Sequence, residues 1–169
     1  MTEPGSGPGS DQEVARLKAV HACVVIDTPR ETSFDSIVFT AAQLFRVPMA
    51  MLAIVDEDRV WLKSSVGPLP KEWARRQSFC TLVVETGQML VVEDTLADSR
   101  YSQVAMVGGP PNVRFYAGIP LLGPENLPIG TLSVLDRMPR TVPERARTQL
   151  QQLAREAQGL LKRRTPVEY

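Results

Sequence analysis

Apolar residues along the chain follow two different spacings, and the spacing separates helices from strands. Within residues 11–24, 32–45 and 144–161 they recur every three or four positions, which is the period of one face of an α-helix. Shorter runs, in which apolar residues are continuous or alternate with polar ones, are typical of strands. We expect five strands, at 49–55, 60–66, 89–93, 114–121 and 129–135. This order of elements predicts an α+β fold with a largely antiparallel sheet of five to six strands.

Several helix ends are marked by residues that cap or break a helix. Asp27-Thr28-Pro29 ends the first helix, and Pro48 prevents the second from continuing. Ser78 can cap a short helix that Gly87 would end. Thr141-Val142-Pro143-Glu144 has the spacing of a capping box and predicts the start of the last helix.

Length and composition predict one domain without a membrane or secretion signal. The 169 residues, 43% of them hydrophobic, suffice for a single core. Residues 1–10 offer little apolar surface, so we expect a disordered tail there, a single domain at 11–164 and a second tail at 165–169. The longest apolar run, Val47 to Val55, contains a proline and is too short to span a bilayer. The first residues lack the basic and apolar regions of a signal peptide.

Charge and cysteine content narrow the class of protein further. Lysine plus arginine and aspartate plus glutamate both total 19, so the formal net charge is zero and a nucleic-acid partner is not expected. Cys23 and Cys80 lie far apart in the sequence and favour free thiols in a reducing compartment, the cytoplasm. His21 is the only histidine, which leaves no histidine-based metal site and no Ser-His-Asp triad. We therefore expect no catalytic and no metal-binding residues.

Six segments, in the right order, resemble the GAF domain family. They are Ile26-Asp27-Thr28-Pro29; Val55-Asp56-Glu57-Asp58-Arg59 with Trp61 and Lys63; Ser78-Phe79-Cys80; the stretch from Val91 to Tyr101; Arg114-Phe115-Tyr116-Ala117-Gly118 with Pro120-Leu121; and Ile129 to Asp136. The resemblance covers roughly Leu17 to Leu161. It implies a central antiparallel sheet, with the first, second and last helices on one face and a small-molecule pocket on the other, under the connections between residues 67 and 112.

The chain departs from this family just after Ser78-Phe79-Cys80. Many GAF domains continue there with small residues and a histidine, whereas this chain has Thr81-Leu82-Val83-Val84. The resemblance therefore implies that one polar contact of the pocket is missing here.

Cys80 is the candidate for thiol chemistry. It lies with Ser78 at the start of the predicted short helix, where the helix dipole lowers a thiol pKa, and Arg75 and Arg76 are close in the sequence. A redox or covalent role is one interpretation. The other is that Cys80 is a small buried hydrophobic residue.

Five polar residues are candidates for orienting a ligand: Asp94, Asp98, Arg100, Arg114 and Tyr116. Two acids, two bases and a hydroxyl on the pocket face would provide the hydrogen bonds that a bound small molecule needs. In the alternative interpretation, the two aspartates cap turns and pair with the arginines to fix the loop.

Aromatic residues complete the candidate site. The walls of an apolar cavity are expected to include Trp61, Phe79, Phe115 and Tyr116, although aromatic residues on strands also form ordinary core. The resemblance to GAF domains, together with the missing catalytic residues, favours a non-catalytic module of bacterial signal transduction. Such a module would bind an unidentified small molecule and act on a downstream signalling protein.

Two further expectations concern assembly and alternative functions. GAF domains commonly dimerise through their terminal helices, and apolar stripes suited to this are Val14, Leu17 and Val24 in the first helix and Ala146, Leu150, Leu153, Ala157 and Leu160 in the last. The alternative is that each stripe packs on the sheet.

A second functional class is a free methionine sulfoxide reductase or thiol redox sensor that uses Cys80. Cyclic-nucleotide and bilin binding are disfavoured because the motifs for them are not recognisable in this sequence. The sequence does not identify a cofactor.

Overall fold

The computed structural model describes residues 8–164. The main elements follow in this order: α1 (Pro8–Ala22), α2 (Thr32–Phe45), β1 (Met49–Val55), β2 (Arg59–Val66), β3 (Glu72–Ala74), α3 (Phe79–Thr86), β4 (Leu90–Val92), α4 (Ala105–Gly108), β5 (Phe115–Leu122), β6 (Pro128–Asp136) and α5 (Glu144–Arg163). The two predicted tails lie largely outside the described residues, at 1–7 and 165–169. Residues 8–10 of the first one belong to α1.

The strands form one antiparallel sheet in the order β3-β2-β1-β6-β5-β4. All five predicted strands are present, and the sixth, β3, adds three residues at the edge beside β2. Every residue of β1 is buried because β2 and β6 flank it and side chains cover both of its faces. The prediction of an α+β fold built on an antiparallel sheet is confirmed.

Helix ends follow the predicted signals in some places and not in others. Ser78 caps α3 by accepting a hydrogen bond from the Cys80 N–H at 3.1 Å, and Gly87 ends that helix with a φ of 65°. Helix α2 ends at Phe45, before Pro48, and is followed by Arg46, whose left-handed backbone lets its N–H reach the carbonyls of the last turn. The predicted capping box of the last helix is wrong: α5 begins at Glu144 after Pro143, and no side chain caps it.

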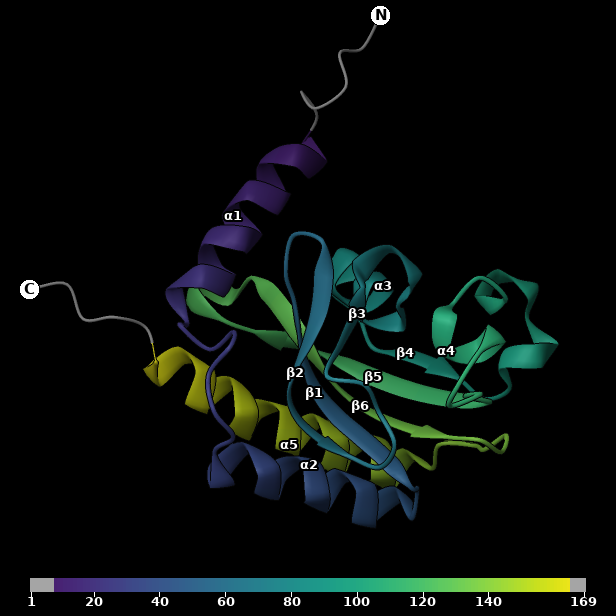
Figure 1. Ribbon diagram of the computed structural model, residues 1–169. Helices are drawn as coiled ribbons and strands as arrows, with labels where there is room; N and C mark the ends of the chain where they lie inside the picture. Colours follow the sequence, from purple (N-terminus) through teal and green to yellow (C-terminus); the bar gives the residue numbers. More distant parts are fainter. Residues whose placement is uncertain (1–7, 165–169) are drawn as a thin grey trace, which may run out of the picture.

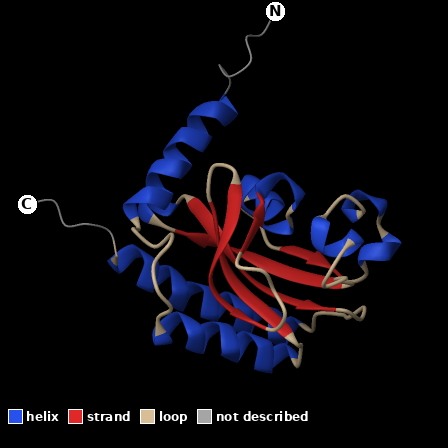
Figure 2. Ribbon diagram, in the orientation of Figure 1, coloured by secondary structure: helices blue, strands red, loops and turns tan. Residues whose placement is uncertain are grey.

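Helices cover both faces of the sheet (Figures 1 and 2). α2 and α5 lie side by side on one face, and their apolar residues form one core with inward-facing residues of the strands. α3 and α4 lie on the other face above a second core, which includes Met49, Met51, Phe79, Val83 and Tyr116. None of the helices in residues 8–164 combines the length with the apolar composition of a membrane span.

Helix α1 lies on the predicted face, with α2 and α5, for only part of its length. Only its last turns join that core, through Ala19 and Val20. The rest of the helix extends beyond the end of the sheet (Figure 1). It is attached there by polar contacts, among them a hydrogen bond of 2.7 Å from the Arg16 guanidinium to the carbonyl of Val55, the last residue of β1.

Candidate functional site

The start of α3 and strand β5 bring four of the predicted site residues together. Because the Ser78 cap turns the chain toward the sheet, Phe79 and Cys80 point into the second core. Tyr116 reaches the same place from β5. These four residues are between 0% and 4% exposed, so they form a closed interior and not the wall of an open pocket.

A chain of hydrogen bonds satisfies the polar atoms of this interior. The Tyr116 hydroxyl lies 2.7 Å from Ser133 Oγ, which donates to Thr131 Oγ1 at 3.2 Å. Thr131 Oγ1 in turn donates to Cys80 Sγ at 3.2 Å, and Sγ lies 3.9 Å from the Tyr116 hydroxyl. The ring is therefore closed on itself without a ligand. We call Cys80, Tyr116, Thr131 and Ser133 the buried hydroxyl–thiol cluster.

Aromatic packing closes the cluster from the side of α3. The Phe79 ring stacks on Tyr116 with 4.4 Å between ring centroids, and Tyr101 lies 5.6 Å from Phe79 on a neighbouring turn. Gly118 leaves the room that the Tyr116 ring needs, since a Cβ at this position would lie 2.2 Å from the Tyr116 hydroxyl. The glycine of the Arg114–Gly118 motif is thus explained by the tyrosine two residues before it.

The protonation state of the cluster differs from the sequence-based expectation. Burial raises the pKa of the Cys80 thiol, and the hydrogen bonds from Thr131 and Ser78 offset this only in part. Arg75 does not lower the pKa of this thiol, because its guanidinium binds Glu13. Burial also raises the pKa of Tyr116. The cluster is therefore neutral, and the expectation that the helix dipole gives Cys80 a lowered pKa is wrong.

The four charged candidates lie in a different place, on the loop between β4 and β5. Asp94 accepts a hydrogen bond from the Leu96 N–H at 3.0 Å and pairs with Arg114. Asp98 accepts from the Arg100 N–H at 3.0 Å and pairs with the Arg100 side chain. These contacts lower the pKa of each aspartate, chiefly through the Leu96 N–H for Asp94 and the Arg100 side chain for Asp98. These contacts agree with the alternative interpretation, in which the two aspartates cap turns and pair with the arginines to fix the loop.

Trp61 lies on the other face of the sheet from Cys80. It packs against the core that α2 and α5 cover, and it lines a separate surface hollow of about 640 Å³ together with Arg30 and Lys71. Phe115 belongs to the same core, so the structure separates Trp61 and Phe115 from Phe79 and Tyr116. The predicted aromatic wall consists of the latter two only.

Comparisons with known proteins agree with this architecture. A family model described as "GAF domain" matches residues 29–159. The chain belongs to the GAF domain family. A cyclic di-GMP phosphodiesterase of Pseudomonas aeruginosa is 33% identical over 149 residues, which are 88% of this chain and 25% of that enzyme. The GAF domain thus spans about a quarter of this curated relative.

Solved structures of low sequence identity share the fold. The GAF domain of an Acinetobacter phosphoenolpyruvate-protein phosphotransferase has a TM-score of 0.63 at 17% identity, covering 92% of this chain and 94% of that one. Free methionine-R-sulfoxide reductase from Neisseria meningitidis, solved with its substrate, has a TM-score of 0.62 at 17% identity, covering 90% and 91%. At this level of identity the likeness concerns the fold alone.

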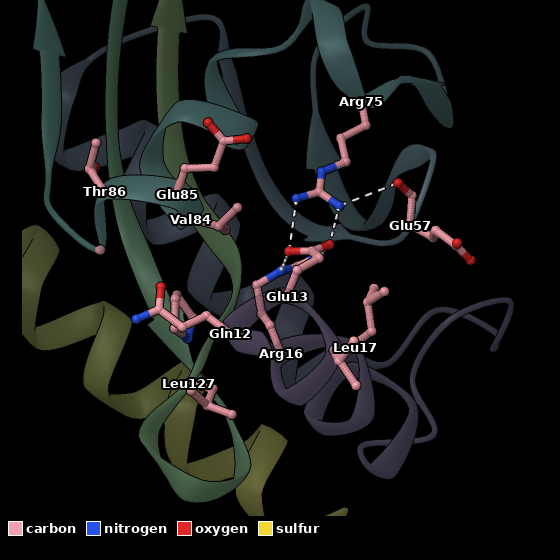
Figure 3. A pocket seen from close by; sticks show the side chains of 13 residues that line it. Gln12, Glu13, Arg16, Leu17, Glu57, Arg75, Val84, Glu85, Thr86 and Leu127 are labelled. Atoms are coloured by element: carbon pink, nitrogen blue, oxygen red, sulfur yellow. Dashed lines mark hydrogen bonds and ion pairs between the residues drawn. The ribbon is translucent and has the colours of Figure 1, made fainter. Parts of the chain in front are cut away.

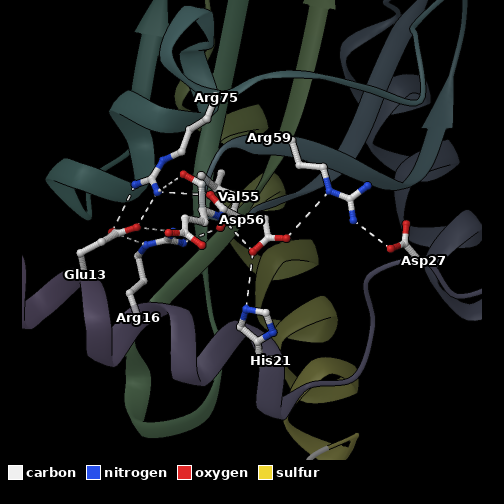
Figure 4. Close-up of polar contacts among 9 residues, drawn as sticks. Glu13, Arg16, His21, Asp27, Val55, Asp56, Arg59 and Arg75 are labelled. Carbon is white, nitrogen blue, oxygen red and sulfur yellow. Dashed lines mark hydrogen bonds and ion pairs between the residues drawn. The ribbon is translucent and has the colours of Figure 1, made fainter.

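A network of ion pairs attaches α1 to the rest of the GAF domain (Figure 4). Glu13 lies between two guanidiniums: Arg16 donates to it at 2.9 and 3.0 Å, and Arg75, in a 3₁₀ turn before α3, donates to it as well. Burial alone would raise the pKa of Glu13, but the hydrogen bonds and charges of these arginines outweigh it and lower the pKa to about 2. Further along α1, His21 Nε2 lies 3.6 Å from Asp56 Oδ1.

Beside this network lies a surface groove of about 820 Å³ between α1 and α3 (Figure 3). Its apolar lining comes from Val14 and Leu17 of α1, Val84 of α3, and Leu127 with Pro128. The groove is open to solvent and does not reach the buried hydroxyl–thiol cluster.

Sequence reasoning did not single out two members of the cluster, Thr131 and Ser133. Both lie on β6 with Leu132 between them, and both side chains are buried. Two hydroxyl residues at alternate positions of an otherwise apolar strand were the available signal, because such residues share one face of the sheet and need partners there.

Proposed function

We propose that the chain is a non-catalytic regulatory GAF domain of bacterial signal transduction. The similarity to a cyclic di-GMP phosphodiesterase supports the connection to signalling. Since the matching region makes up a quarter of that relative, we propose the role of a regulatory module and not the enzymatic activity. Family membership supports a small-molecule ligand and a downstream signalling partner.

The closed cluster is the observation that carries the non-catalytic part of the proposal. A thiol reacts as the thiolate, and it must be reached by its substrate. Cys80 is 0% exposed and its pKa is raised. Its hydroxyl neighbours are occupied by one another, so they offer no free acid or base to a reacting group.

The same observation bears on ligand binding. A small molecule that contacts Ser78, Phe79, Cys80 or Tyr116 must first displace α3 from β5 and β6, because these side chains fill the space between them. The charged pairs of Asp94 and Asp98 lie on the loop outside this space. We therefore propose that binding, where it occurs, is coupled to a movement of α3.

Native mass spectrometry of the freshly purified chain tests for a ligand directly, because a retained small molecule appears as a mass difference. A thermal-shift panel that includes cyclic di-GMP is the complement, since any ligand of the folded state raises Tm. A bound ligand should also change the amide exchange of α3. Hydrolysis of cyclic di-GMP by the isolated chain would overturn the non-catalytic proposal.

A free methionine sulfoxide reductase is the second candidate, favoured by the presence of a cysteine in the first turn of α3 in a fold shared with such enzymes. Incubation with methionine sulfoxide and a thiol reductant distinguishes the two. We expect no turnover. Turnover that Cys80→Ser abolishes and Cys23→Ser leaves intact would establish the reductase instead.

A cytoplasmic location is proposed from the thiols. Cys23 and Cys80 are both free and buried, and they belong to different cores, so they cannot form a disulfide with each other in this fold. Free thiols of this kind persist in reducing compartments.

A further inference from the structure

The hollow that Trp61 lines lies beside β2 and does not involve the buried hydroxyl–thiol cluster. Its volume of about 640 Å³ falls within the usual range of small-molecule sites. Three segments enclose it: residues 27–30 between α1 and α2, residues 61–65 of β2, and residues 69–72, which lead into β3. None of these residues belongs to α3, so a molecule can enter this hollow without displacing that helix.

The walls of this hollow are held together at two points. Lys63 Nζ donates to the Pro29 carbonyl at 2.5 Å, which attaches the segment between α1 and α2 to β2. Arg59 pairs with Asp27 of the same segment at 2.8 Å (Figure 4) and with Glu72 of β3 at 2.5 Å. A site that is already ordered loses less conformational entropy when it binds a ligand. The hollow is therefore preformed.

The acids of this hollow are neutralised, whereas two of its cations keep free donors. Both carboxylates that line it share the guanidinium of Arg59. Arg30 donates only through Nε, to Asp35 at 3.3 Å, and its side chain is 76% exposed. Within residues 8–164, its two terminal nitrogens have no hydrogen-bond partner and Lys71 Nζ has no ion pair. The charge that is left for a ligand is positive, which favours an anion.

The rest of the lining includes an aromatic and several apolar side chains. Trp61 is partly exposed, and Leu69 with Pro70 comes from the loop that leads into β3. An indole ring packs favourably against another ring, either offset-stacked or edge to face. A guanidinium with two free nitrogens binds a carboxylate or a phosphate through two parallel hydrogen bonds. Together these groups fit a ring that carries an anionic group.

We propose that this hollow is a small-molecule site, separate from the interior beneath α3, and that it binds a planar aromatic molecule carrying a phosphate or a carboxylate. The ring packs against Trp61, and Arg30 and Lys71 hold the anion. This site goes beyond the proposed regulatory role, because it does not depend on a ligand beneath α3. Its ligand contacts β2 and the segment between α1 and α2 together.

Two probes represent the two anions: AMP carries a phosphate and 4-hydroxyphenylacetate a carboxylate. Isothermal titration calorimetry of the full chain should give a Kd below about 1 mM for at least one of them, and the probe that binds identifies the anion. Adenosine and 4-hydroxyphenylacetamide keep the ring without the charge, whereas ribose 5-phosphate and acetate keep the charge without the ring. Each should bind about tenfold or more weakly than the matching probe, because half of the recognition is lost.

The two cations are exposed, so replacing them does not threaten the fold. Arg30→Gln and Lys71→Gln should each weaken binding of the probe about threefold to tenfold, the loss expected of a partly exposed ion pair. Binding of the neutral analogue should not change. Arg76→Gln is the matched control, because Arg76 is also an exposed arginine but lies outside the hollow. It should bind the probe as tightly as the unchanged chain does.

Tryptophan fluorescence locates the bound ring, because the chain has two tryptophans and only Trp61 lines the hollow. In Trp73→Phe the emission comes from Trp61 alone, and it should change with the same Kd that calorimetry gives. In Trp61→Phe it comes from Trp73, which packs against the core beneath α3, and it should not respond. Phenylalanine keeps a ring at position 61, so calorimetry should still detect binding in this variant.

The proposal is wrong if neither probe binds, if a neutral analogue binds as tightly as its charged probe, or if Arg30→Gln and Lys71→Gln both bind the probe normally. A response of Trp73 in place of Trp61 would also overturn it. A ligand beneath α3 is recognised separately, because it changes the amide exchange of α3 and is insensitive to the Arg30 and Lys71 variants. The failure of this site and the failure of the proposed regulatory role are therefore distinguishable.

Discussion

Replacing Lys63 by methionine removes a charge that the fold buries completely. The side chain is 0% exposed, and Nζ donates to Glu31 Oε2 at 2.5 Å, to Thr28 Oγ1 at 2.8 Å and to the Pro29 carbonyl at 2.5 Å. Three acceptors satisfy the three N–H groups of the ammonium. The contact joins β2 to the segment between α1 and α2, so its loss affects the face of the sheet that α2 and α5 cover.

The cost follows from what each partner retains. Removing one member of a buried ion pair costs about 3–5 kcal/mol. The lower end applies here, because Glu31 is 35% exposed and keeps Arg164 at 2.7 Å, while the Thr28 hydroxyl still donates to the Val25 carbonyl. Methionine also preserves the packing of the apolar stem. We therefore expect Lys63→Met to lower the free energy of unfolding by about 3 kcal/mol, or Tm by about 6–12 °C at this chain length.

Urea and thermal unfolding followed by circular dichroism measure this loss, with the exposed Lys71→Met as control, expected within about 0.5 kcal/mol of the unchanged chain. The hydrogen bond from Lys63 is the main reason why the pKa of Glu31 is lowered. A carboxylate with a lowered pKa contributes its stability above its unfolded pKa of about 4.3 and loses it as the pH falls. The difference in free energy of unfolding between the unchanged chain and Lys63→Met should therefore become smaller below about pH 4. A loss under 1 kcal/mol at pH 7, or one that does not change with pH, would refute the reasoning.

Three other changes test separate parts of the structure. Because the pKa of Glu13 is lowered to about 2, Glu13→Gln should flatten the rise of stability between pH 2 and 4.5 in acid titrations, and it should cost about 1 kcal/mol at pH 7, since the carboxylate is 34% exposed. Gly118→Ala should cost about 2–4 kcal/mol in urea unfolding by displacing the Tyr116 ring, whereas Gly159→Ala in α5 should be neutral or stabilising. Alkylation of Cys80 by iodoacetamide at pH 8 should proceed only at the rate at which the chain opens; fast alkylation of the folded chain would contradict its burial and raised pKa.

The sequence predicts the central strands well for a physical reason. β1 is buried on both faces, so an unbroken apolar run is enough to identify it. β3 has no such signal, because Glu72 and Ala74 are exposed and the strand exists only through its pairing with β2. The ends of α3 follow from Ser78 and Gly87, which act within a few residues of themselves.

The face on which Trp61 lies could not be predicted from alternation alone. Leu52 pairs with Ser64 and Ala53 with Leu62, so Lys63 is the extra residue of a β-bulge. Beyond the bulge the alternation shifts by one, so Trp61 and Ser64 share the face that α2 and α5 cover although they are three positions apart. Nothing in the local sequence marks such a shift, which depends on the partner strand.

The contacts of the candidate site also join residues that are far apart in the chain. Cys80 and Thr131 are 51 residues apart, and Glu13 and Arg75 are 62 apart. The two buried hydroxyl residues on β6 indicate that hydrogen-bond partners are needed, but they do not identify those partners. The sequence does not show which arginine pairs with Glu13, because Arg75 and Arg76 are adjacent and carry the same charge.

One short segment connects the buried cluster to α1. Arg75 binds Glu13 of α1 through its guanidinium, and its carbonyl accepts a hydrogen bond from the Thr81 hydroxyl in the first turn of α3. Cys80 precedes Thr81 directly, so any displacement of α3 that opens the cluster also strains the attachment of α1. Thr81 stands in the region where many GAF domains have a histidine. In this chain the Thr81 hydroxyl bonds to the carbonyl of Arg75, whose guanidinium binds Glu13, so the departure from the family pattern lies between α3 and the attachment of α1.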